Sequence, residues 1–216
     1  MHLNAHIAFS TAVTLLMTTI GPVRASWLEI VACILAGVVI DGDFIFLHFS
    51  RHKNHRMLLT HSIVLPLAFI LASIALMFLA RGTSLAWTAW TCAINALVHD
   101  AVDSIDWGLN FFANGKIVGK RILLGGASPE AYYAEARKTT PIYAAFYRAY
   151  YGHKAMRALE VVALVTMCAA LAVSWPGAGQ DHWWTILAYA GLLGFHAMEW
   201  RRCKAATRPA RPRAAS

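Results

Sequence analysis

The chain alternates long apolar stretches with short polar segments that carry most of its charge. About 20 helical residues cross the hydrocarbon core of a bilayer, and six apolar stretches approach that length. The pattern predicts an all-α fold: a polytopic helical membrane protein with about six transmembrane helices arranged as three hairpins. The stretches are Ile7–Ile20, Trp27–Phe49, Ile63–Ala80, Leu85–Phe112, Leu159–Trp175 and Trp183–Trp200. We expect one membrane domain over residues 1–200 and a basic, disordered cytoplasmic tail at 201–216.

The first apolar stretch also has features of a secretory signal. It is short, and residues 23–26 after it resemble a signal-peptidase site. However, residues 1–6 contain no Lys or Arg, which the start of such a signal normally carries. We therefore expect this stretch to remain in the protein as an uncleaved span.

Composition agrees with a membrane protein. Hydrophobic residues make up 58% of the 216 positions and charged residues only 14%. Soluble domains carry about 25% charged residues, so lipid is the expected main solvent. The four cysteines stand singly, without a CxxC pair, at positions 33, 92, 168 and 203. They indicate apolar packing or reduced thiols, and not zinc ligands or disulfides.

The basic residues predict the orientation of the spans. With the N-terminus inside, segments 50–62, 113–158 and 199–216 lie inside and hold 17 of the 19 Lys and Arg residues. Only Arg24 and Arg81 remain outside, which is the distribution expected for a membrane protein with both termini in the cytoplasm. The net charge of +8 is thereby explained, and no nucleic-acid partner is expected.

The long inner loop, 113–158, has two helix-start signals. Ser128-Pro129-Glu130 offers an N-cap, a proline at the first helical position and an early acid, and Thr140-Pro141 repeats the signal. After them, aromatic residues recur at helical spacing and form one stripe at 143, 146, 147, 150 and 151. Two interpretations fit this stripe equally: an interfacial helix in the headgroup layer, or a helix packed against the bundle.

The ionisable residues inside the spans gather at the inner end, although only Lys and Arg were used to set the orientation. Such residues are costly in lipid, so each needs a reason. They are His2 and His6 at the first span, Asp41 and Asp43 in the second, His52, His55 and His61 around the third, and His99, Asp100, Asp103 and Asp106 in the fourth. This convergence predicts one shared polar site.

Helical spacing sharpens that prediction. His99, Asp103 and Asp106 stand at i, i+4 and i+7 and share one helix face, as a pair of metal ligands on one helix does. Asp41 and Asp43 instead point about 200° apart on an α-helix. Either Gly42 loosens the backbone so that both carboxylates turn inward, or only one of the two is a ligand.

A simpler interpretation exists for each residue alone. A histidine near a span end is often a hydrogen-bonded interfacial residue, and an aspartate there often pairs with a loop arginine. Taken together, however, these groups would all need separate partners in one leaflet. Mixed imidazole and carboxylate ligands suit Zn best, with Mn or Fe as alternatives, and do not suit an all-oxygen Ca site. We therefore predict a divalent metal site.

Four motifs in this order resemble the YdjM family, whose members are described as predicted membrane-bound metal-dependent hydrolases. They are His6, the Asp41-Gly42-Asp43 element, the His55-Arg56…Thr60-His61-Ser62 element, and His99 with Asp103. The resemblance covers residues 1–125, including Gly119-Lys120-Arg121. The sequence departs from the family pattern at two points. One more residue separates His55-Arg56 from Thr60-His61 than in the shorter family form, and Phe44 stands where a histidine is common. The resemblance implies a bacterial inner-membrane protein, distantly related to zinc-dependent phosphoesterases.

The resulting hypothesis is a membrane-embedded hydrolase that acts on a phosphoester, possibly of a lipid, at the cytoplasmic face. The expected metal ligands are His6, Asp43, His61, His99 and Asp103, with His2, Asp41 and His55 as further candidates. Asp41 or Asp106 is expected to act as general base. Arg56 either neutralises a substrate phosphate or serves as an ordinary positive-inside anchor.

Two other functions were weighed. A transporter needs polar residues through the whole depth of the membrane, but in the outer halves only Glu29 and Asn95 stand out. A noncatalytic membrane adaptor, or a metal sensor, would hold a structural metal in a closed site and dock through its basic segments.

Overall fold

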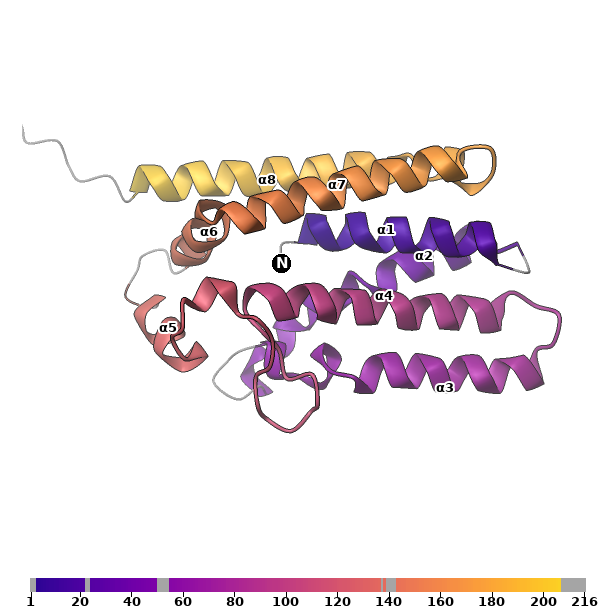
Figure 1. Ribbon diagram of the computed structural model, residues 1–216, viewed down its shortest axis with the longest axis horizontal. Coiled ribbons are helices and arrows are strands. Elements are labelled where there is room, and N and C mark those ends of the chain that lie inside the picture. The colour runs from indigo at the N-terminus through magenta and orange to yellow at the C-terminus, as the bar shows by residue number, and fades with distance from the viewer. Residues whose placement is uncertain (1–2, 22–23, 50–54, 137, 139–142, 207–216) are drawn as a thin grey trace, which may run out of the picture.

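The protein is helical throughout the part described by this computed structural model, residues 3–21, 24–49, 55–136, 138 and 143–206 (Figure 1). Its α-helices are α1 (Leu3–Ile20), α2 (Trp27–Ala36), α3 (Val64–Leu79), α4 (Leu85–Asp106), α5 (Pro129–Ala136), α6 (Tyr143–Gly152), α7 (Lys154–Ser174) and α8 (Trp184–Ala206). Short 3-10 helices are η1 (Val39–Phe49), η3 (His55–Met57), η4 (Leu59–His61), η5 (Ile122–Leu124) and η6 (Ala178–Asp181). Within these ranges only one isolated bridge is β-like, so the all-α prediction is confirmed.

Helix α1 lies at the centre of the bundle and packs against α2, α4, α7 and α8. Its contact with α7 is built from small residues, because the alanines at 5, 8 and 12 face those at 163 and 170 in the core. Small side chains let two helix backbones approach closely. On the other side α3 packs against α4 and forms the edge of the molecule (Figure 1).

The long helices run back and forth along one direction (Figure 1). Consequently the start of α1, the end of α8 and the short helices α5 and α6 lie at one end, whereas the links α3–α4 and α7–α8 lie at the other. The described parts of the basic segments 50–62, 113–158 and 199–216 lie at the first end. We call it the basic end.

The second apolar stretch is not one continuous helix. Helix α2 ends at Ala36, Gly37 caps it, and the chain continues as η1 in tighter 3-10 turns. The break allows a close approach, since a Cβ on Gly37 would lie 2.1 Å from Oγ of Ser10 on α1. The expectation of an unbroken span over Trp27–Phe49 is thus corrected.

Other boundaries also shift. Helix α4 stops at Asp106, and Gly108 follows with φ of +76°, so the fourth stretch breaks before Phe112. Helix α8 continues to Ala206, where Lys204 lies over the ring of Trp200, so the predicted disorder from 201 onward is corrected for 201–206. Residues 207–216 lie outside the described ranges.

The inner loop contains the two expected helices. The hydroxyl of Ser128 accepts a hydrogen bond from the Ala131 N–H at the start of α5. The second start signal, Thr140-Pro141, lies outside the described residues. On α6 the aromatic stripe packs against the bundle: Tyr150 is 2% exposed and Tyr151 contacts the ring of Trp200. The packed interpretation therefore holds for the described part of the stripe.

Two of the described helices, α1 and α7, are long and apolar enough to cross a membrane by length and composition. Helices α2 and α3 are apolar but shorter. These findings are weak support for membrane association, because a buried core helix or an N-terminal signal sequence has the same properties.

Candidate metal centre

The half of α4 that lies at the basic end of the bundle supplies the first residues of the site. His99, Asp103 and Asp106 lie on one face of this helix, as their spacing predicted, and all three are buried. The pairing is close, since Nε2 of His99 lies 3.7 Å from Oδ2 of Asp103 one turn later.

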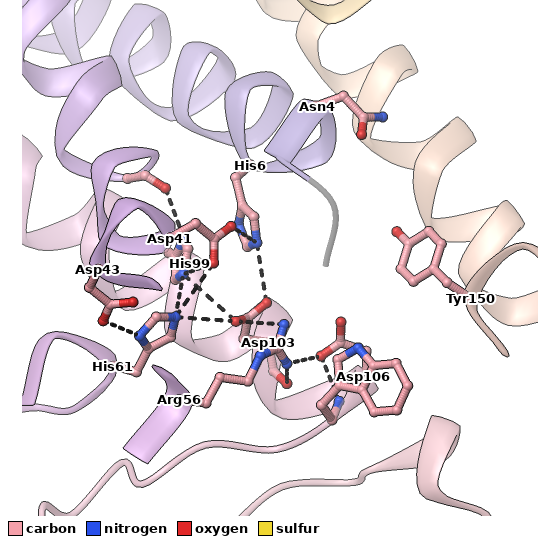
Figure 2. A network of polar contacts seen from close by, with 12 residues as sticks. Asn4, His6, Asp41, Asp43, Arg56, His61, His99, Asp103, Asp106 and Tyr150 are labelled. Atoms are coloured by element: carbon pink, nitrogen blue, oxygen red, sulfur yellow. Dashed lines mark hydrogen bonds and ion pairs between the residues drawn. The ribbon is translucent and has the colours of Figure 1, made fainter. Parts of the chain in front are cut away.

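Helix α1 brings His6 against that face. The imidazole of His6 stacks on that of His99, with ring centroids 3.9 Å apart. Its Nε2 lies 3.2 Å from Oδ1 of Asp103 and 3.6 Å from Oδ2 of Asp41. Residues of three elements, far apart in sequence, therefore meet at one point (Figure 2).

Both carboxylates of the Asp-Gly-Asp element turn toward the cluster, but they reach different places. Oδ1 of Asp41 lies 3.5 Å from Nε2 of His61 and 3.8 Å from Nε2 of His99, whereas Asp43 lies at the other nitrogen of the His61 ring, Nδ1 (Figure 2). The 3-10 conformation, with about three residues per turn, separates the two side chains less than an α-helix would. A Cβ on Gly42 would meet nothing within 4 Å, so no close packing requires this glycine.

His61 at the end of η4 closes the cluster. Its Nε2 lies 3.5 Å from Nε2 of His99 and 3.7 Å from Oδ2 of Asp103. Its Nδ1 donates a 3.0 Å hydrogen bond to Oδ2 of Asp43, which also accepts one from the hydroxyl of Thr60. His61 is completely buried.

The donor atoms are spaced as metal ligands are. One atom each from His6, Asp41, His99 and Asp103 lies within 4.8 Å of all the others, so this group can hold a metal ion. Ligands at tetrahedral positions about 2.1 Å from a zinc ion would be about 3.4 Å apart. The pair distances of 3.2–3.8 Å around this point, including those of His61, are close to that spacing.

The imidazole rings of His61 and His99 are also fixed by hydrogen bonds from their Nδ1 atoms. Metal-binding histidines usually donate their second ring N–H to a carboxylate or a backbone carbonyl, which fixes the ring and leaves the other nitrogen for the ion. Nδ1 of His99 donates to the Gly37 carbonyl at 2.8 Å, and Nδ1 of His61 donates to Asp43. In both rings Nε2 is thus the atom aimed at the cluster.

Arg56 is part of the cluster. Its side chain is 5% exposed, Nη2 lies 3.0 Å from Oδ2 of Asp103, and Nη1 lies 2.7 Å from Oδ1 of Asp106. The same Asp106 oxygen accepts the Trp107 N–H at 2.6 Å. The guanidinium therefore faces two protein carboxylates, and Asp106 is tied by two donors.

Negative charge is in excess at this point. Among the described groups of the cluster there are four carboxylates, those of Asp41, Asp43, Asp103 and Asp106, and one guanidinium, that of Arg56. At His61, outside the apolar stretches, burial lowers the pKa, but hydrogen bonds to Asp41 and Asp43 outweigh it and raise the pKa to about 9. A field that favours a proton so strongly also favours a divalent cation.

The remaining predicted residues have other outcomes. His2 and His52 lie outside the described ranges, and the side chain of His55, in η3, is likewise not described. Asp100 is one of the ionisable residues of the fourth apolar stretch, and its position in the sequence predicts neither a ligand nor a catalytic role for it. It is buried, and neither of its oxygens has a hydrogen-bond partner among the described residues. Its position inside an apolar stretch was the signal that marked it.

No family model, no curated protein and no solved structure matches the sequence. Fold and site therefore define the class on their own: an all-helical protein with two membrane-compatible helices and a buried histidine–aspartate cluster able to hold a metal ion.

Proposed function

We propose that this protein is a six-span, YdjM-like hydrolase of the bacterial inner membrane that uses a divalent metal, Zn above all, to cleave phosphoesters. Both termini would be cytoplasmic, and the site would open at the cytoplasmic face. The observation that carries the proposal is the buried cluster in which His6, His61 and His99 converge on Asp41 and Asp103. Burying so many ionisable groups is costly unless they bind something.

Side-chain exposure supports a lipid environment. On α3, five large apolar side chains, at 67, 71, 77, 78 and 79, are 47–83% exposed, while Ser73 faces inward and donates to the Ala86 carbonyl. An apolar surface of this extent around a polar interior suits lipid as solvent and is rare on soluble monomers. The gathering of basic segments at one end supports the proposed orientation.

The donor set supports a transition metal. Imidazole with carboxylate ligands is typical of catalytic zinc sites. A bound zinc ion lowers the pKa of its water ligand to about 7 and polarises the group to be cleaved. In the proposal, His6, His61, His99 and Asp103 hold the ion, and Asp43 orients His61.

Asp41 is the general base in this proposal. Its side chain is 15% exposed, whereas those of His6, His61, His99 and Asp103 are exposed by 1% or less. It is therefore the group of the cluster that a water molecule or a substrate can reach. Asp106 is unsuited to this role, because Arg56 and the Trp107 N–H already bind it. Arg56 holds Asp103 and Asp106 in place and does not bind the substrate phosphate.

The element that carries Asp41 favours an amphiphilic substrate. On η1, Ile45, Phe46 and Phe49, which lie four, five and eight residues after Asp41, are 50–73% exposed. Apolar groups beside a catalytic carboxylate suit a molecule with an acyl chain and a phosphoester headgroup. Phosphoester lipids of the inner leaflet are thus the proposed substrate class.

The test combines metal analysis with hydrolysis by the detergent-purified protein. We expect about one transition-metal ion per wild-type chain, lost in His61→Ala and Asp103→Asn. Asp41→Asn should retain the ion but lose hydrolysis of phosphoester lipids. Asp181→Asn, an exposed carboxylate at the other end, is the matched control and should change neither. Absence of metal from the wild type after incubation with Zn or Mn would refute the proposal.

The deep burial of the cluster favours a second candidate, a structural metal in an adaptor or sensor. A structural site has closed coordination and gives the ion no reactive position. In that case the wild type would bind metal without hydrolysing any phosphoester, and Asp41→Asn would lose the ion together with stability. The same two measurements therefore separate the candidates.

A further inference from the structure

A second buried carboxyl group lies apart from the metal cluster. Glu160, on α7, is 6% exposed. No residue of α7 or α8 belongs to the described cluster, and the proposed chemistry does not use Glu160. A carboxyl group buried in an apolar helix is costly and calls for a function.

Glu160 is the centre of a network that joins four helices. Its Oε2 accepts a 2.6 Å hydrogen bond from the Asn4 amide on α1, and its Oε1 accepts one of 2.6 Å from the Tyr150 hydroxyl on α6. The hydroxyl of Tyr189, on α8, donates to the Glu160 carbonyl at 3.2 Å. Nδ1 of His196 donates to Oδ1 of Asn4 at 3.0 Å.

Asn4 therefore has both ends of its side-chain amide fixed, one by α7 and one by α8. Burial and the neighbouring Glu160 raise the pKa of Tyr150, on α6 outside the apolar stretches. Its hydroxyl thus stays protonated and remains a donor to the carboxylate.

Asn4 and His6 are two residues apart on α1, so their side chains leave the helix about 200° apart. Figure 2 shows Asn4 directed away from the cluster and His6 directed into it. Both side chains are buried, with exposures of 0% and 1%. One turn of α1 is therefore fixed on one side by Glu160 and on the other presents a metal ligand.

The core around α1 and α7 is otherwise apolar. Buried alanines of both helices share one core cluster with Leu15, Met156 and Met167. Such smooth, apolar contacts between helices give close approach but tolerate small rotations and shifts. Hydrogen bonds to a buried carboxylate are directional and define one arrangement.

We propose that Glu160 is a positioning residue of the metal centre: through Asn4 it sets the rotation and height of α1, which places Nε2 of His6 beside Asp103. This inference rests on the proposed metal function. The inference also gives the α7–α8 hairpin a role in positioning His6, although no described residue of this hairpin is a proposed ligand.

The test is Glu160→Leu, which removes the carboxylate but keeps the volume apolar, in the full-length protein in detergent. The substitution leaves the Asn4 amide and the Tyr150 hydroxyl without their acceptor and lowers stability, so folding of the variant is checked first by circular dichroism. We expect affinity for Co²⁺ to fall by about 10- to 100-fold, as for other groups that orient a ligand. The visible absorption of bound Co²⁺ should also change, because one imidazole is displaced. Glu160→Gln should restore part of both.

The control is Ser174→Ala at the far end of the same helix, where the buried hydroxyl bonds only to carbonyls of its own helix. It should leave affinity and spectrum unchanged. If Glu160→Leu does not fold, Tyr150→Phe removes a single hydrogen bond to the same carboxylate and should shift both readouts in the same direction. Wild-type affinity and spectrum in the folded Glu160 variants would overturn the inference.

These outcomes are distinct from those of the hydrolase proposal. A wild type that binds Co²⁺ without hydrolysing phosphoesters leaves the positioning role intact but ends the hydrolase. A wild type that binds no metal overturns both. Normal metal binding and hydrolysis in every Glu160 variant would end the positioning role alone.

Discussion

At the scale of single residues, the site separates groups that the sequence treats as equivalent. Asp41 and Asp43 flank one glycine, yet Asp41 reaches the imidazoles of His6, His61 and His99, whereas Asp43 binds Nδ1 of His61 and the Thr60 hydroxyl. Arg56 was expected at a substrate phosphate or at the lipid surface, but it pairs with Asp103 and Asp106 in the interior. Each role follows from which atoms are neighbours.

Asp43→Asn tests the orientation of His61. The amide can still accept the hydrogen bond from Nδ1, but it lacks the charge that makes the opposite nitrogen a better ligand. We expect zinc affinity to fall by about 10- to 100-fold, measured by competition with a chromophoric chelator. Asp181→Asn should have no effect. An unchanged affinity would mean that Asp43 does not support the ion through His61.

Arg56→Met tests the buried ion pairs. Removing the guanidinium leaves Asp103 and Asp106 buried without their cation, which typically costs about 3–5 kcal/mol. We expect the metal-free protein to unfold at a clearly lower temperature in detergent, measured by circular dichroism. Arg157→Met, an exposed site on α7, should shift the midpoint little. Equal midpoints for the two variants would contradict the buried pairing.

At the scale of elements, the break after α2 is what makes the site. A continuous helix over this stretch would carry Asp41 and Asp43 to opposite sides, but the 3-10 turns of η1 bring both inward. The break also frees the Gly37 carbonyl to hold His99. The change from α-helix to 3-10 helix after Ala36 therefore helps to position the side chains of Asp41, Asp43 and His99.

Gly37→Ala tests this junction. The added Cβ would lie 2.1 Å from Oγ of Ser10 and 3.2 Å from the Asn95 carbonyl, so α1 and α2 must move apart. We expect about 1–3 kcal/mol lower stability and weaker metal binding. Ser10→Ala in the same chain should recover part of both losses. Gly191→Ala, where a Cβ meets nothing within 4 Å, is the control.

The contact of α2 with α4 predicts a cross-link. Sγ of Cys33 lies 3.9 Å from Sγ of Cys92, a proximity that the isolated cysteines of the sequence did not indicate. A membrane-permeant oxidant such as copper–phenanthroline should join them, with loss of two hydrogens and of both free thiols by mass spectrometry. Cys92→Ser should abolish the product. A cross-link to Cys168 instead would contradict this packing.

At the scale of the whole molecule, the arrangement of the helices decides at which end of the bundle each polar group lies. Antiparallel long helices bring the N-terminal end of α1, the C-terminal end of α4 and the 3-10 segments between α2 and α3 together at the basic end (Figure 1). The histidine–aspartate cluster and the Glu160 network lie on the two sides of α1 near this end (Figure 2). One central helix thus links both halves of the molecule.

The proposed orientation predicts which positions label from outside the cell. In a variant without cysteines, Arg81→Cys in the α3–α4 link should react with a membrane-impermeant maleimide in intact spheroplasts. Lys204→Cys near the end of α8 should react only after the membrane is opened. The two positions lie at opposite ends of the bundle (Figure 1). Labelling of both from outside would refute the six-span topology.

The apolar periodicity and the i, i+4, i+7 spacing on α4 are local patterns, so the sequence by itself determined the helical class and the polar face that α4 contributes to the cluster. It also predicted that histidines and aspartates from separate segments converge. The break at Gly37, the different roles of Asp41 and Asp43, the burial of Arg56 and the Glu160 network were decided by the tertiary structure. They depend on the close approach of α1 to α2, α4 and α7, and such contacts between distant segments have no local signature in the chain.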